Sequence, residues 1–126
     1  MNDLPFKVLT LLTGLVVAGE ALALLVGMHF LGHSDNPWLS AKNDLFLTLD
    51  IVSGLGLVCL ALVQRGTTWP YLFYALAGLA LLTHGIREWE YLARAANTFC
   101  ANAPLLVMNN LKMAGLLAAA FLSLSL

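Results

Sequence analysis

Charged residues are scarce in this sequence of 126 residues, of which Asp, Glu, Lys and Arg together make up 10%. Soluble domains carry about 25% charged and roughly 45–50% apolar residues, whereas 60% of this chain is hydrophobic. A water-soluble fold could not cover its surface with so few ionic groups, but a lipid bilayer makes no such demand. The composition therefore predicts an integral membrane protein.

The sequence also has little basic charge and few cysteines. Because the net charge is −1, neither nucleic acid nor another polyanion is an expected partner. Cys59 lies in an apolar run and Cys100 in a polar connection. The predicted topology places these two cysteines on opposite sides of the apolar layer, so we do not expect a disulfide, and no CxxC motif indicates a redox or thiolate metal site.

What the sequence does have is four long apolar runs. They predict membrane spans at about residues 6–31, 45–63, 71–90 and 104–126, near the ~20 residues that cross a bilayer. The first run is too long for a cleaved signal peptide, and Pro104 is expected to open the fourth span. The predicted fold is an all-α, four-transmembrane-helix antiparallel bundle, a single membrane domain over residues 1–126 with both termini on the same side.

The orientation of this bundle is not fixed by its charges. Polar segments rich in turn-forming residues connect the runs, and cations occur at both ends of the bundle. Lys7 and Arg65 lie on one side, Lys42 and Arg94 on the other, so the positive-inside rule gives a tie. We expect the termini to be cytoplasmic and the membrane to be a bacterial or archaeal cell membrane.

Several polar residues nevertheless lie inside the predicted spans, where a charged side chain costs at least about 2.5–3.5 kcal/mol at the helix centre. The candidate binding or proton-handling residues among them are Glu20, Asp50, His84, Arg87, Glu88, Asn109 and Lys112, and Asn110 is a further polar residue of the fourth span. Antiparallel threading at 1.5 Å per residue places them in one leaflet, with Glu20 somewhat deeper than the rest. The other half of the bundle is expected to be apolar.

Helical phase predicts that these residues point inward, because each polar stripe continues as a stripe of small residues that allow close helix packing. The predicted stripes are Thr13–Glu20–Ala23–Gly27, Asp50–Ser53–Gly54–Ala61, His84–Arg87–Glu88–Tyr91 and Asn109–Lys112–Gly115–Ala119–Ser123. Two interpretations follow. The acids and bases neutralise one another and fix the packing or hold a partner, or they form a site in which Asp50 and His84 titrate as a pair.

No cofactor is predicted. A haem b site needs two facing histidines, but His29 lies about half a turn out of phase with Glu20, and His33 lies in a loop. A metal site built from Glu20, Asp50, His84 and Glu88 is disfavoured because Arg87 and Lys112 already supply positive charge. The stretch His84-Gly85-Ile86-Arg87 is similar to a short segment of the haem and quinone anchor subunits of succinate dehydrogenases. The span count differs and a second ligand is absent, so no family is assigned.

Three functions remain open, and no catalytic motif accompanies any of them. The first is a non-catalytic subunit or accessory component of a larger membrane complex, which implies a membrane protein partner or a homo-oligomer. The second is a small proton- or cation-coupled transporter or membrane ligand-binding protein. The third is a redox membrane subunit that handles a quinone or haem.

Overall fold

The computed structural model describes residues 3–31, 43–63, 69–94 and 99–124, and four α-helices account for nearly all of them. Their bounds are α1 Leu4–Leu31, α2 Asn43–Val63, α3 Trp69–Arg94 and α4 Phe99–Ser123. Each contains a segment long and apolar enough to cross a membrane, with mean hydropathies from 1.2 to 2.3. The prediction of four helices that are long and apolar enough to cross a membrane is confirmed. Most of the first two predicted connections, and residues 95–98 of the third, lie outside the described residues.

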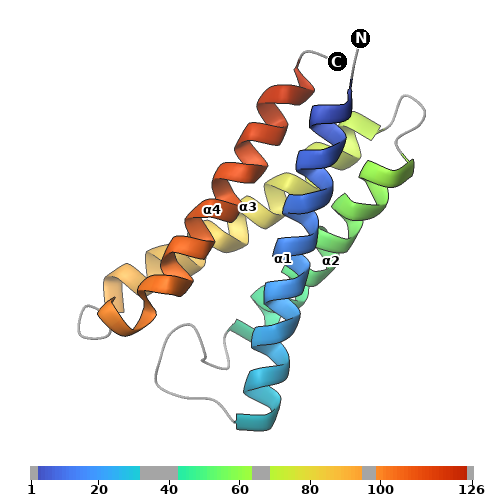
Figure 1. Ribbon diagram of the computed structural model, residues 1–126. Helices are drawn as coiled ribbons and strands as arrows, with labels where there is room; N and C mark the ends of the chain where they lie inside the picture. The colour runs from blue at the N-terminus through green and yellow to red at the C-terminus, as the bar shows by residue number, and fades with distance from the viewer. Residues whose placement is uncertain (1–2, 32–42, 64–68, 95–98, 125–126) are drawn as a thin grey trace.

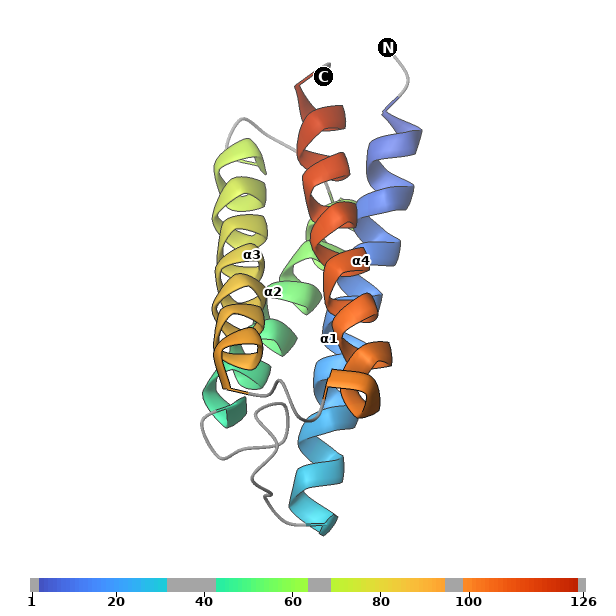
Figure 2. The same ribbon diagram turned by 90° about the vertical axis from the view of Figure 1, so that its left-hand side faces the viewer.

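The helices pack as a ring in which each contacts two neighbours: α1 with α2, α2 with α3, α3 with α4, and α4 with α1. Figures 1 and 2 show that consecutive helices run in opposite directions, so the first turn of α1 and the last turn of α4 lie at the same end of the bundle. We call this the terminal end. At the opposite end, the last turns of α1 extend beyond the other helices (Figure 1).

The tightest contact of the bundle is the crossing of α1 and α2 at two glycines. A Cβ atom added to Gly14 would lie 2.8 Å from the Gly54 carbonyl oxygen, and one added to Gly54 would lie 2.7 Å from both the Ala18 backbone nitrogen and the Gly14 oxygen. These distances are too short for any side chain to fit. The two backbones therefore touch directly, which is how small residues join membrane helices.

Aromatic and aliphatic side chains form the core near the terminal end. The ring of Phe6 packs 5.0 Å from Phe73 and 5.4 Å from Trp69, measured between centroids. Leu57 and Leu116 are buried against the same cluster. The core of this half of the bundle is thus apolar. The buried charged side chains lie in the other half, as the sequence predicts.

The helices α3 and α4 extend beyond their membrane spans. The helix α4 begins at Phe99 and so contains Pro104 in its second turn. Because proline has no N–H, the helix lacks the hydrogen bond that this residue would donate to the carbonyl four residues earlier. The candidate span itself does begin at Pro104, and α3 continues past the predicted span to Arg94.

Candidate functional site

Asp50 is the centre of the buried polar residues. It lies on α2, is fully buried, and accepts hydrogen bonds from two residues of α3. Thr83 Oγ1 donates to Oδ1 and Arg87 Nη2 donates to Oδ2, each at 2.5 Å. Arg87 is only 3% exposed, so the ion pair is removed from solvent. A carboxylate held in this way joins α2 to α3 by charge as well as by packing.

His84 packs beside this pair and is also fully buried. Its Nδ1 lies 2.6 Å from the Ala80 carbonyl oxygen and 3.6 Å from Asp50 Oδ1. Because a carbonyl oxygen can only accept, Nδ1 must carry the proton and donate to Ala80. The other ring nitrogen, Nε2, is buried and has no hydrogen-bond partner among the described residues. In the neutral ring this atom is an acceptor with an unused lone pair.

A second buried ion pair joins α4 to α1. Lys112 Nζ donates to Glu20 Oε1 at 2.9 Å, and the Lys112 side chain is 2% exposed, against 18% for Glu20. Asn109, one turn earlier on α4, is buried as well and donates through Nδ2 to the His84 carbonyl oxygen at 3.3 Å. In the part of the chain that the structure describes, the Asn109 Oδ1 atom has no hydrogen-bond partner. Asn109 therefore connects the α4 side of the cluster to α3.

Both ion pairs run between the two halves of the chain. The acids of the two pairs, Glu20 and Asp50, lie on α1 and α2, and their buried cations, Lys112 and Arg87, lie on α4 and α3. Two negative charges of the first hairpin are thus neutralised by two positive charges of the second. Neither hairpin is neutral on its buried face without the other.

Glu88 lies apart from this cluster. Its Oε1 accepts a hydrogen bond from Asn110 Nδ2 at 2.5 Å, on the exposed surface between α3 and α4. The sequence placed Glu88 on the same face as His84 and Arg87, but only those two are buried. At about 100° per residue, Arg87 and Glu88 cannot both point at the bundle centre, and Arg87 occupies that position.

The structure changes two further sequence-based expectations. Ala23, predicted to share the inward stripe of α1, is exposed. The buried face of α1 instead passes through Thr13, Val17 and Ala21, because Glu20 lies at its edge, where Lys112 reaches it. Thr83, a hydrogen-bond donor to Asp50, was not predicted. Its position one turn before Arg87 is the signal that could have identified it.

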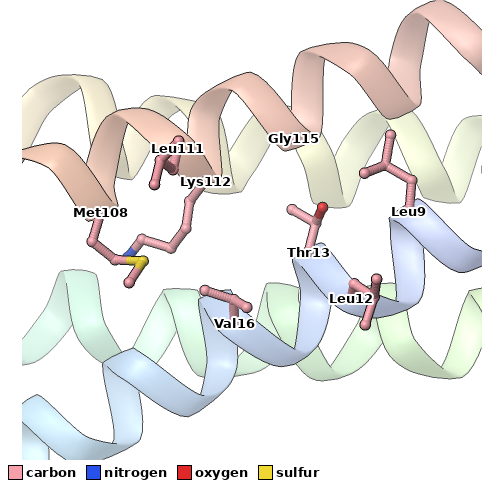
Figure 3. A pocket seen from close by; sticks show the side chains of 8 residues that line it. All are labelled: Leu9, Leu12, Thr13, Val16, Met108, Leu111, Lys112 and Gly115. Carbon is pink, nitrogen blue, oxygen red and sulfur yellow. The ribbon is translucent and has the colours of Figure 1, made fainter.

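A groove opens beside the second ion pair, between α1 and α4. It encloses about 280 Å³ and is lined by Leu9, Leu12, Thr13, Val16, Met108, Leu111, Lys112 and Gly115. Figure 3 shows the Lys112 side chain crossing from α4 toward α1, with its nitrogen next to Met108. The lining is otherwise almost wholly apolar, so the groove suits hydrocarbon better than a polar solute.

The arrangement as a whole offers charge pairing and hydrogen bonding rather than an assembled catalytic set. Within the described residues, no three His, Cys, Asp or Glu side chains group in a way that could hold a metal ion. The side chains of His29, Tyr91 and Cys100 lie outside the described part, as does His33. Comparison with protein-family models, with curated proteins and with solved structures gives no match. We therefore base the functional proposal on the fold and on the residues described above.

Proposed function

We propose that this chain is a non-catalytic subunit or accessory component of a larger membrane complex. The observation that carries the proposal is the pairing of the buried charges: Asp50 with Arg87, and Glu20 with Lys112. Buried ions that already neutralise each other fix helix positions, whereas a transport or catalytic site needs groups that change partner or charge. A chain with so little mass outside its helices also suits a role within an assembly.

The proposal includes a location and an orientation. The four apolar helices support an integral membrane location, and we assign the membrane to a bacterial or archaeal cell. Since the first turn of α1 and the last turn of α4 share one end of the bundle (Figure 1), both termini belong on one side of that membrane, and we assign them to the cytoplasm.

Purification of the tagged protein from its native membrane in a mild detergent tests this function. We expect a partner protein in constant stoichiometry, identified by mass spectrometry, and a fraction without visible absorption bands. A Soret band would instead support the haem-containing redox subunit. A protein that purifies alone, with no partner at any detergent concentration, would contradict the accessory function.

A second function, proton-coupled transport or ligand binding, is favoured by one atom. The unpartnered Nε2 of His84 is a buried acceptor next to Asp50, and unsatisfied buried groups of this kind often mark functional sites. In proteoliposomes this function predicts a pH-dependent flux that Asp50→Asn abolishes. If the purified protein shows no such flux and is bound to a stoichiometric partner, the transport function is contradicted and the accessory function remains.

A further inference from the structure

The Glu88–Asn110 pair is a polar feature on a surface that otherwise faces lipid. Both residues lie within candidate membrane spans, and Asn110 is exposed close to the middle of α4. Nearby exposed side chains are large and apolar, with Leu82 at 59% and Trp89 at 77% exposure. A carboxylate and an amide in such surroundings are costly unless another molecule covers them.

The charge of Glu88 is also not balanced within the described residues. Asn110 Nδ2 gives it one neutral hydrogen bond and uses its other hydrogen on the Leu106 carbonyl oxygen. The neighbouring cations are engaged elsewhere, Arg87 with Asp50 and Lys112 with Glu20. What covers Glu88 should therefore bring a positive charge.

The shape of the adjacent surface fits a helix. Gly78, Leu82, Gly85 and Trp89 follow one another at spacings of four, three and four, which is the seam of a packed helix pair. A Cβ atom added at Gly78 or Gly85 would meet nothing within 4 Å, so a neighbouring backbone can approach closely there. We call this stripe with the Glu88–Asn110 pair at its edge the α3 outer face.

We propose that the α3 outer face binds one transmembrane helix of another protein, and that this helix carries a lysine or arginine level with Glu88. This deepens the proposed accessory function, on which the existence of the partner rests. A second copy of this chain fits less well. A two-fold contact through this face would bring two Glu88 carboxylates together. Of the described cations of the spans, Arg87 and Lys112 are buried in ion pairs, and Lys7 pairs with Asp3 in the first turn of α1, at the other end of the bundle.

A designed peptide tests the surface without knowledge of the partner. The probe is a leucine–alanine helix of about 20 residues with one lysine, placed in a series of depths, and the control peptide has leucine in its place. Binding is measured by energy transfer from the labelled peptide to the labelled full-length protein in phosphatidylcholine vesicles. We expect the peptide with lysine level with Glu88 to bind about tenfold more tightly than the leucine peptide.

Variants of the protein complete the test. Glu88→Gln should reduce binding of the lysine peptide to that of the leucine peptide, and Gly85→Leu should block both peptides. Glu90→Gln is the matched control, since this acid lies on α3 about 200° from Glu88 around the helix axis, and it should change nothing. Equal binding of the two peptides, or no effect of Glu88→Gln, would overturn the proposal. Energy transfer between copies of the protein that Gly85→Leu abolishes would assign the face to a second copy and also overturn it.

The peptide test of the α3 outer face and the purification test of the accessory function can fail independently of each other. If the peptide results hold but the protein purifies alone from its native membrane, the docking surface stands and the accessory function fails. The opposite result is that the Glu88→Gln variant still co-purifies with its native partner and that the peptides bind the parent protein and the variant equally. The accessory function then stands, and the partner does not bind at the α3 outer face.

Discussion

Asp50 and Arg87 depend on each other because each is buried where no water can replace the lost partner. Arg87 Nη2 and Thr83 Oγ1 both donate to the Asp50 carboxylate, so both of its oxygens are hydrogen-bonded. Such a pair contributes little net stability compared with well-packed apolar residues, yet removing one member leaves a buried, uncompensated charge. Substitution of one member of the pair should therefore lower the free energy of unfolding more than replacement of both members by apolar residues.

We expect Arg87→Ala to lower the free energy of unfolding by about 3–5 kcal/mol, because it leaves Asp50 charged and buried without its cation. The double variant Asp50→Leu, Arg87→Met should recover most of that loss. Reversible unfolding in mixed micelles measures both. Lys7→Ala is the control, since its ion pair with Asp3 is about 40% exposed on both sides and should be worth under about 1 kcal/mol. An Arg87→Ala protein as stable as this control would show that the Asp50 pair is not buried.

The tautomer of His84 is a prediction that is measured on the unsubstituted protein. Because Nδ1 donates to the Ala80 carbonyl oxygen, the neutral ring should be the tautomer with its proton on Nδ1 and a bare Nε2. The nitrogen-15 chemical shifts of His84 distinguish the two tautomers, with His84→Gln used for assignment. A proton found on Nε2 alone would mean that Nδ1 does not donate to Ala80 and that the ring is rotated away from the position described.

At the scale of helices, α1 and α2 are joined by direct backbone contact at their crossing, in addition to side-chain packing around Ala21 and Leu47. The space at the crossing is set by Gly14 and Gly54, and Ala18 closes it from one side. Since nothing flexible lines this contact, a single added methyl group has to separate the two helices or shift one along the other.

We therefore expect Gly14→Ala to destabilise the protein by about 1–3 kcal/mol, the usual cost of overpacking. Gly19→Ala provides a matched control on the same helix, because a Cβ at Gly19 would meet nothing within 4 Å and alanine favours helix over glycine. Thermal unfolding of the two variants in the same detergent compares them. A Gly14→Ala protein that unfolds together with Gly19→Ala would argue against the crossing described.

The helices could be predicted from the sequence, whereas their rotations could not all be predicted. A long apolar run is a local property, so the four spans follow from it directly. The direction in which a residue points depends on its neighbours: Glu88 and Ala23 were assigned inward positions that Arg87 and Ala21 occupy. For the same reason the sequence did not assign Asp50 to Arg87 as its partner, and Thr83 was missed.

For the whole molecule, the arrangement of the helices makes the topology testable. With α1 beginning and α4 ending at one end of the bundle (Figure 2), reporters fused to the two termini should give the same result. We expect a fluorescent protein at either terminus to be fluorescent and alkaline phosphatase at either terminus to be inactive, as for cytoplasmic ends. A fusion in the connection between α1 and α2 is the control and should behave oppositely. Opposite results at the two termini would contradict four spans.

The division of buried charge between the two halves also bears on how the chain is made. During synthesis α1 and α2 leave the ribosome first, carrying Glu20 and Asp50 on their buried face before Arg87 and Lys112 exist. The neutralising cations arrive with the second hairpin of the same polypeptide, so the two carboxylates lack their partners until Arg87 and Lys112 have been synthesised.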